Sequence, residues 1–459
     1  MMILESRDKM KKLNKIFFVW ILIVTVLTAN IKVFAQDSIS QIIQAEGYDV
    51  SIADMPKASI VASVSNGEIL WQENPDLELD PASLTKLMTI FIVYDAVKSG
   101  KISLIDKIQA TASDQAISGI SILSNTPIIT GVDYPVIELV KMSLIHSSNV
   151  ATTMLANFLN NDADGFIDSM NAKAKELGMT NTTFTGPSGA LSRDYAGYYS
   201  PKKYSLTAPN QTTARDLAKL SIALLKAHPE ITEITKQNTV TVMEGTPYAQ
   251  TLKNTNHSVE GDIFGVPGVT GLKTGSSDTA GYNYIVSYQK DGIELVEVVL
   301  AVGSWPSAQG EFNRHKFGNA ILKYVLKTFE QKTVYNAGVQ TIQGKKIKIN
   351  EPINIFVEKG KEPQTSLSGD HLTISTPFGT LYETNYMVKF EEADSGEKES
   401  TIVANEGAPE TTKNVIDKTL ESIKNVPVVL WMILGAAIVI LIMLHILLSK
   451  LRSKKRKKL

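Results

Sequence analysis

The chain has 459 residues, 43% of them hydrophobic, so it is long enough for more than one domain and can bury a substantial core. It contains no cysteine, which excludes disulfides, thiolate metal sites and a cysteine nucleophile. The net charge of -1 hides two basic ends around an acidic body, so we expect no nucleic-acid partner. Because the six histidines form no H-x-x-x-H pair and no Gly-rich phosphate loop is present, we expect neither a metal nor a cofactor.

Residues 1–35 have the pattern of a signal peptide. The basic stretch RDKMKKLNK precedes the apolar run IFFVWILIVTVLTA, and the sequence Val33-Phe34-Ala35 suits cleavage after Ala35. An uncleaved anchor or a buried helix is the alternative, but the apolar run is short for a membrane span.

Residues 36–332 are predicted to form one α+β domain. Two short apolar runs around Asn66-Gly67 predict a hairpin with a type I′ turn, and a mostly apolar helix follows at residues 84–97. Further helices are predicted within residues 98–160, 212–228 and 312–329, and a second hairpin around Asp291-Gly292. Because strands flank a helical middle, the first and last strands are expected to share one sheet.

The remaining segments are predicted to be a β module and a membrane anchor. Residues 333–395 show short strand patterns without helices, and residues 396–425 are polar, acidic and typical of a linker. Residues 426–448 are apolar for more than the length of a membrane span, and the basic tail 449–459 follows directly. Basic residues beside a span stay in the cytoplasm, so the sequence predicts a single-pass protein of the cell membrane with its catalytic body outside the cell.

The start of the helix at residues 84–97 combines a hydroxyl with an amine. Ser83 and Lys86 stand three positions apart, which places them on one helix face, one turn from each other. A serine becomes a good nucleophile when a neighbouring base takes its proton, and burial can lower the pKa of a lysine enough for that role. The spacing alone is a weak signal, since Ser200 and Lys203 share it in a loop.

Two further motifs make the interpretation specific. Ser147-Ser148-Asn149 lies between two helical runs, and Lys273-Thr274-Gly275 opens a predicted strand. S-x-x-K, then S-x-N, then K-T-G, in this order, is the signature of penicillin-recognising serine enzymes. In isolation each motif could equally be a helix cap or an exposed polar residue, so the order of the three carries the inference.

The stretches PASLTKLMT, SLIHSSNVATTMLA, TTARDLA and VTGLKTGSSDTAGYNYIVS resemble those of low-molecular-mass penicillin-binding proteins, the serine-type, S11-like D-alanyl-D-alanine carboxypeptidases. The resemblance covers residues 52–327 and extends to the β module, which this family often carries. It implies the serine β-lactamase/DD-peptidase-like fold. Two departures stand out: a full C-terminal span replaces the family's usual amphipathic helix, and Ser148 replaces the glycine of Ser-Gly-Asn, adding a side chain near the site.

The resemblance also implies roles for the motif residues. Ser83 attacks the D-Ala-D-Ala carbonyl, Lys86 is the base, and Ser147 relays a proton between Lys86 and the leaving nitrogen. Substrate binding falls to four residues: Asn149, Lys273, Thr274 and Gly275. The backbone N–H groups of Ser83 and Ser276 would form the oxyanion hole. The implied substrates are peptidoglycan stem peptides, with β-lactam antibiotics as inhibitors.

Three alternatives share these motifs. A membrane-anchored class A-like β-lactamase would need a positioned glutamate for deacylation, and no convincing Glu-x-x-x-Asn element occurs between Ser147 and Lys273. A non-enzymatic β-lactam sensor would need an effector domain, for which the tail of about ten residues is too short. Transpeptidase or endopeptidase activity on the same substrates stays open, because the shape of the groove decides the acceptor.

Overall fold

The computed structural model describes residues 37–383 and 385–393. The predicted signal peptide, linker, transmembrane helix and basic tail therefore lie outside the described residues. Within those described ranges, no helix has both the length and the apolar character needed to cross a bilayer.

The described helices are α2 (Ile39–Ala45), η1 (Ile52–Asp54), η2 (Ala82–Thr85), α3 (Lys86–Lys98), α4 (Ala112–Ser118), α5 (Val136–Ile145), α6 (Asn149–Leu159), α7 (Ala163–Glu176), η3 (Ser192–Tyr195), α8 (Ala214–Ala227), η4 (Pro229–Ile231), α9 (Thr232–Thr235) and α10 (Ala308–Thr328), where η marks a 3₁₀ helix. The described strands are β1 (Ala58–Ser63), β2 (Ile69–Glu73), β3 (Lys107–Gln109), β4 (Asp133–Pro135), β5 (Thr239–Val242), β6 (Gln250–Lys253), β7 (Val269–Ser277), β8 (Gly281–Lys290), β9 (Ile293–Val302), β10 (Phe329–Tyr335), β11 (Gly338–Ile342), β12 (Lys345–Ile349), β13 (Ile353–Glu358), β14 (Thr365–Ser368), β15 (His371–Ile374), β16 (Tyr386–Lys389) and β17 (Glu391–Glu392).

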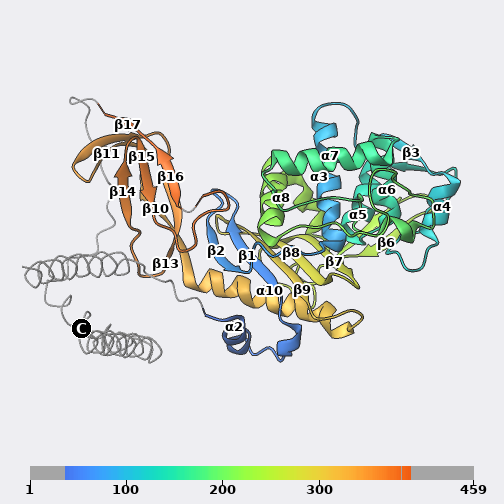
Figure 1. The fold of residues 1–459 in the computed structure, drawn as a ribbon, viewed down its shortest axis with the longest axis horizontal. Helices are drawn as coiled ribbons and strands as arrows, with labels where there is room; N and C mark the ends of the chain where they lie inside the picture. Colours follow the sequence, from blue (N-terminus) through green and yellow to red (C-terminus); the bar gives the residue numbers. More distant parts are fainter. Residues whose placement is uncertain (1–36, 384, 394–459) are drawn as a thin grey trace, which may run out of the picture. The chain divides into compact units, whose positions relative to one another are not determined.

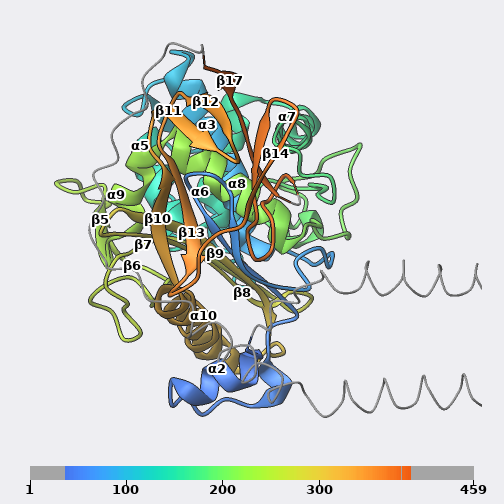
Figure 2. The same cartoon turned by 90° about the vertical axis from the view of Figure 1, so that its left-hand side faces the viewer.

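A five-stranded antiparallel sheet in the order β2-β1-β9-β8-β7 organises the larger domain. The early strand β1 pairs with the late strand β9, with Ala58 opposite Leu300 and Ser63 opposite Leu295. The prediction that the first and last strands share a sheet is therefore confirmed. Figures 1 and 2 show α2 and α10 on one face of this sheet and α3, α5, α6 and α8 on the other.

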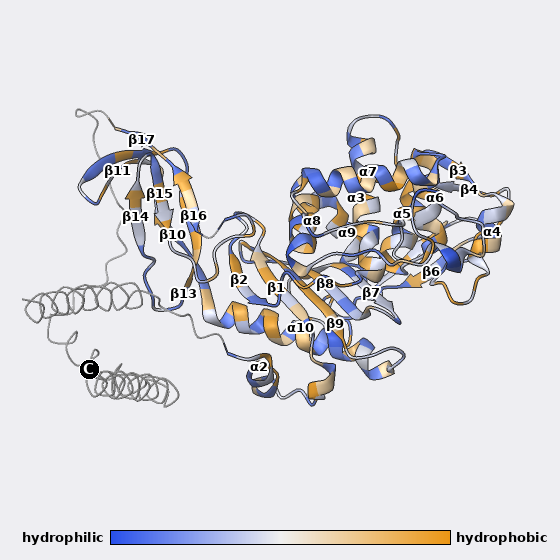
Figure 3. Cartoon of the chain, viewed as in Figure 1, coloured by the Kyte–Doolittle hydropathy of each residue, from blue (hydrophilic) through white to orange (hydrophobic). Residues whose placement is uncertain are grey.

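Both faces of the sheet are buried, which explains the nearly continuous apolar runs of its strands. Along β1, Ile60 and Ala62 face the core shared with the helical middle, whereas Val61 faces the core beneath α10. Figure 3 shows apolar residues predominating along the central strand β9. The helices that carry two of the three motifs therefore pack on one face of this sheet.

The two predicted hairpins form, but only one turn has the expected type. Asp291 and Gly292 both adopt positive φ, 52° and 78°, as a type I′ turn requires. In the first hairpin only Gly67 is left-handed, so the predicted type I′ turn at Asn66-Gly67 is wrong. The Asn66 side chain instead bonds Glu68, donating from Nδ2 to its carboxylate and accepting from its backbone N–H at 3.1 Å, within a longer loop.

Strands β10 to β17 form small antiparallel sheets around a core of their own, centred on Ile347, Ile355 and Leu372. Glu68 of the first hairpin loop contacts this β module, because its buried carboxylate accepts the Phe356 N–H at 3.1 Å. Burial raises the pKa of Glu68 to about 7.

Candidate active site

The nucleophile lies on a short 3₁₀ turn that leads into α3. Ser83 belongs to η2 and is partly exposed, whereas its neighbours Ala82 and Leu84 are buried. The Asp80 carboxylate accepts the Ala82 N–H at 2.7 Å and the Ser277 hydroxyl at 3.0 Å, which ties the turn to the end of β7. The chain therefore presents Ser83 from a fixed backbone rather than from a mobile loop.

Lys86 Nζ is completely buried and has three polar neighbours. They are Ser83 Oγ at 2.9 Å, Asn149 Oδ1 at 2.8 Å and the Ser188 carbonyl oxygen at 2.8 Å. The pKa of Lys86 is held well below its ordinary value, mainly by burial and to a smaller extent by the nearby charge of Lys273. A neutral amine has two N–H groups and one lone pair. With both N–H groups donated to Asn149 and Ser188, the lone pair remains for the Ser83 hydroxyl, as a general base requires.

The sequence analysis missed the loop that supplies the Ser188 carbonyl, because a backbone acceptor leaves no residue signature. The Ser188 hydroxyl and the Tyr195 hydroxyl lie 2.6 Å apart, which fixes the loop from behind. Gly189 follows with φ +89°, and a Cβ atom there would lie 1.8 Å from the Ala82 carbonyl oxygen. The loop therefore packs against the nucleophile turn so closely that only glycine fits.

The second motif joins α5 to α6, as predicted from its position between two helical runs. Asn149 begins α6, and its Nδ2 donates to the Ser124 carbonyl at 3.0 Å while its Oδ1 faces Lys86. Ser147 is buried with φ 63° but makes no side-chain hydrogen bond among the described residues, so its predicted relay contact with Lys86 is not seen here. Ser148 is fully buried and caps α6, accepting the Ala151 N–H. The added side chain is therefore used inside the fold, where its hydroxyl also lies 3.0 Å from Thr126 Oγ1.

The third motif was predicted to open a strand, but it lies in the middle of β7, which already begins at Val269. A Cβ atom on Gly275 would lie 2.7 Å from the Pro81 carbonyl oxygen and 3.0 Å from the Ser83 nitrogen. This close approach explains the glycine and places the β7 backbone against the nucleophile. The Thr274 hydroxyl donates to Thr255 Oγ1 at 2.7 Å.

Lys273 is 1% exposed, and burial together with Arg314 lowers its pKa to about 7. At neutral pH the ammonium and amine forms of Lys273 therefore coexist. An arriving carboxylate would favour the ammonium form.

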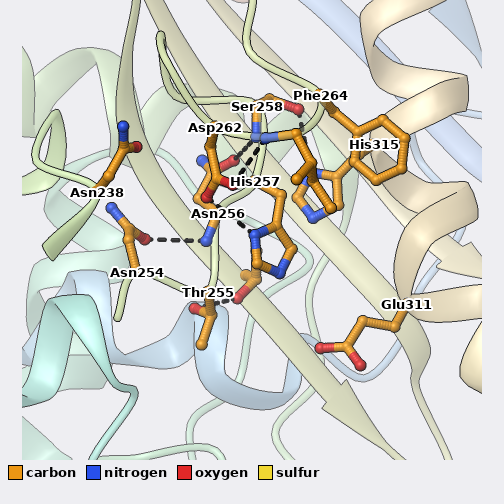
Figure 4. A network of polar contacts seen from close by, with 12 residues as sticks. Asn238, Asn254, Thr255, Asn256, His257, Ser258, Asp262, Phe264, Glu311 and His315 are labelled. Carbon is orange, nitrogen blue, oxygen red and sulfur yellow. Dashed lines mark hydrogen bonds and ion pairs between the residues drawn. The ribbon is translucent and has the colours of Figure 1, made fainter. Parts of the chain in front are cut away.

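Arg314 is a second residue that the sequence analysis missed. It is 2% exposed, lies on α10, and donates from Nη1 to Ser276 Oγ at 2.9 Å. Its Nε donates to His315 Nε2 at 3.4 Å, and Ser258 Oγ lies 3.0 Å from His315 Nδ1. Figure 4 shows the Ser258 hydroxyl facing His315. His315 is thus a neutral positioning residue for a guanidinium at the end of the third motif.

Comparison with known proteins agrees with this geometry. The family model described as D-alanyl-D-alanine carboxypeptidase, peptidase S11, matches residues 53–304, more than half of the chain. The chain belongs to this family. This carboxypeptidase is 28% identical to D-alanyl-D-alanine carboxypeptidase DacF of Bacillus subtilis over 321 residues, covering 68% of the chain and 75% of the relative. It is 33% identical to DacC of Escherichia coli over 252 residues, covering 53% of the chain and 56% of the relative.

Among solved structures, a peptidoglycan synthesis regulatory factor (PBP3) from Streptococcus pneumoniae matches with a TM-score of 0.63 at 25% identity, covering 74% of the carboxypeptidase chain and 98% of the other chain. The penicillin-binding α+β fold and the serine-peptidase class predicted from the three motifs are thereby confirmed. The family is one of hydrolases, so the match favours an enzyme over the sensor and the carboxypeptidase over the β-lactamase. Among the described residues, no cluster of His, Asp or Glu is arranged to hold a metal ion.

Proposed function

We propose that the protein removes the terminal D-alanine from peptidoglycan pentapeptide stems through an acyl-enzyme on Ser83, and that β-lactams acylate the same hydroxyl. The arrangement around Lys86 carries this proposal. Lys86 Nζ is fully buried among two acceptors and one serine hydroxyl. Because burying an amine costs free energy, the stability of the fold does not explain a lysine at this position. It suits a base that must stay neutral.

Acylation begins when Ser83 Oγ attacks the carbonyl carbon between the two D-alanines. Lys86 accepts the hydroxyl proton as the O–C bond forms. The C–N bond then breaks, the leaving amine takes up a proton, and D-alanine departs. The transfer from Lys86 through Ser147 to the leaving nitrogen stays a prediction, since no hydrogen bond joins Lys86 to Ser147 among the described residues.

The remaining motif residues bind substrate in this proposal. Arg314 and Lys273 provide positive charge for the terminal carboxylate, and Thr274 offers it a hydroxyl. Asn149 Nδ2 donates one hydrogen to the Ser124 carbonyl, and its second hydrogen is left for the carbonyl of the peptide amide. The N–H groups of Ser83 and Ser276 stabilise the oxyanion, which is worth a few kcal/mol per donor. Water then hydrolyses the ester and frees Ser83.

Mass spectrometry of the purified protein tests this mechanism. With a pentapeptide ending in D-Ala-D-Ala we expect release of one D-alanine per turnover, and with penicillin a long-lived adduct on Ser83. Ser83→Ala should abolish both. The mechanism is refuted if the variant still labels with penicillin at another serine, and the sensor alternative gains support if the wild type labels but never releases D-alanine.

We place the catalytic body outside the cell, held by residues 426–448 after removal of residues 1–35. The support is the basic flank beside each apolar segment and the acidic body between them. Protease added to intact, wall-stripped cells should digest the body and spare the C-terminal segment, and a resistant body would contradict this placement. A truncated chain of residues 36–425 should be soluble.

A further inference from the structure

A cavity of about 620 Å³ opens between β3, α4, the end of α6 and the loop that follows η3. Its volume lies in the range of small-molecule sites. Two aromatic side chains stand exposed at its walls, Phe158 at 39% and Tyr198 at 51%. None of the catalytic motif residues lines it. We refer to it as the Tyr198 cavity.

One buried polar group of the Tyr198 cavity has no partner in the described part of the chain. Tyr199 lines the cavity and is 3% exposed, and its buried hydroxyl has no hydrogen-bond partner among the described residues. Burial raises the pKa of Tyr199, so this hydroxyl keeps its proton and can donate. The half-buried Asn157 and the exposed Asn161 add amides whose side chains make no hydrogen bond within the described part of the chain and are open to a ligand. An unpaired buried polar group costs about 1–3 kcal/mol, which a ligand can recover.

The charge of the cavity favours a neutral ligand. Its ionisable lining groups include the cation Lys107 and the acid Asp114. The Asp114 carboxylate is already engaged, because it accepts the Thr111 N–H at 2.8 Å and the Thr111 hydroxyl at 2.7 Å. Amides, hydroxyls and exposed ring faces with little free charge match a sugar, whose hydroxyl and acetamido groups bond to amides and whose C–H face packs on aromatic rings.

The cavity is joined to the catalytic lysine by two elements. Helix α6 begins at Asn149 and carries Phe158 near its end, about 14 Å away at ~1.5 Å per residue. The other link is the loop after α7, in which the Ser188 hydroxyl meets Tyr195, and the Tyr195 ring lies 5.5 Å from the Tyr199 ring. Four residues of an extended peptide span about 13 Å. This is the length between the scissile bond of a pentapeptide stem and the sugar that bears it.

We infer that the Tyr198 cavity binds an N-acetylated amino sugar of the glycan strand whose stem peptide occupies the Ser83 site. The inference rests on the proposed function and deepens it, since it names the part of the substrate beyond the peptide. Binding the sugar adds contacts remote from the reacting bond, and it lowers KM for stems attached to glycan relative to free peptides.

The test compares D-alanine release from a free pentapeptide and from the same peptide carrying its N-acetylated disaccharide. The readout is the ratio of kcat/KM for the two substrates, in the wild type and in Tyr198→Ala and Phe158→Ala. Tyr382→Ala removes an aromatic that is 62% exposed on the β module and serves as the matched control. Partial unfolding lowers both rates and leaves the ratio unchanged, so the ratio reports on the sugar alone.

We expect a ratio of about ten in the wild type and in Tyr382→Ala, falling towards one in both cavity variants. A ratio near one in the wild type, or one that survives both cavity substitutions, overturns the inference. Binding of the glycan by another surface would appear as the second of these results. Failure of the proposed function is distinct, because the free pentapeptide would then not be cleaved at all.

Discussion

Replacing Gly189 by alanine should separate the lysine from its backbone partner without touching a catalytic side chain. The added Cβ would lie 1.8 Å from the Ala82 carbonyl oxygen and 2.9 Å from the Ser83 nitrogen, where ordinary contacts begin at 3.4 Å. Both neighbours are backbone atoms, so the loop must retreat by on the order of 1.5 Å. This movement breaks the 2.8 Å bond from Lys86 Nζ to the Ser188 carbonyl. Since a misplacement of about 1 Å can cost 100-fold in rate, we expect acylation to fall by about 100-fold or more.

Gly197 provides the matched control for this experiment. Its φ of +90° equals that of Gly189 within a degree, yet a Cβ there meets nothing within 4 Å. Gly197→Ala therefore carries the left-handed backbone strain alone, about 1–2 kcal/mol, without the collision. The assay is the rate of acylation by a fluorescent penicillin, with circular dichroism to verify the fold of each variant. If Gly189→Ala acylates within about threefold of Gly197→Ala, the loop does not position Lys86 and the reasoning is refuted.

Three further predictions concern the cations of the site. Lys86→Arg should lower the acylation rate by orders of magnitude, because guanidinium does not give up its proton. Lys273→Arg should retain measurable activity. The reverse pattern of acylation rates would mean that the base is misassigned. Since the pKa of Lys273 is about 7 in the folded protein and 10.5 is its ordinary value, the unfolded chain binds more protons between these values and the free energy of unfolding rises with pH there, by about 1.4 kcal/mol per unit. Lys86 adds a rise of the same sign, because its pKa is lowered too. Denaturant unfolding at pH 7.5 and 9 should show the combined rise, and Lys273→Met should reduce it by about 1.4 kcal/mol per unit; an unchanged slope in the variant contradicts the lowered pKa of Lys273. His315→Phe removes the acceptor of Arg314 Nε. It should raise KM for D-Ala-D-Ala peptides and leave KM for the same peptides with an amidated C-terminus little changed, and His315→Gln should restore part of the difference. An equal rise in KM for both substrates would mean that His315 has only a structural role.

The sequence predicts the three motifs because each consists of side chains at fixed local spacing. Ser83 and Lys86 stand one helical turn apart, so the hydrogen bond between them follows from helix geometry. Hydrophobic patterning likewise predicts the central hairpin at Asp291-Gly292 and the shared sheet of early and late strands. These are properties of short segments, and the fold brings the segments together without altering them.

The rest of the site depends on contacts that no local pattern encodes. The Ser188 carbonyl meets Lys86 across 102 residues of sequence, and any residue type can supply a carbonyl. Arg314 reaches Ser276 from a helix whose sequence resembles an ordinary amphipathic one. Ser148 turns inward because the first turn of α6 needs a cap, a demand that the motif pattern does not reveal.

The pairing of β1 with β9 has a consequence for newly made chains. Ser83 is synthesised early, but three of the five strands of its sheet follow residue 268, and β9, which joins β1 to the rest, is complete only at residue 302. Before then β1 and β2 are a lone hairpin, which is marginally stable in water at best. A growing chain therefore carries Ser83 as an ordinary serine, without the loop, strand or charges that activate it. A β-lactam present during synthesis therefore cannot acylate incomplete chains, and only completed, folded molecules are susceptible to it.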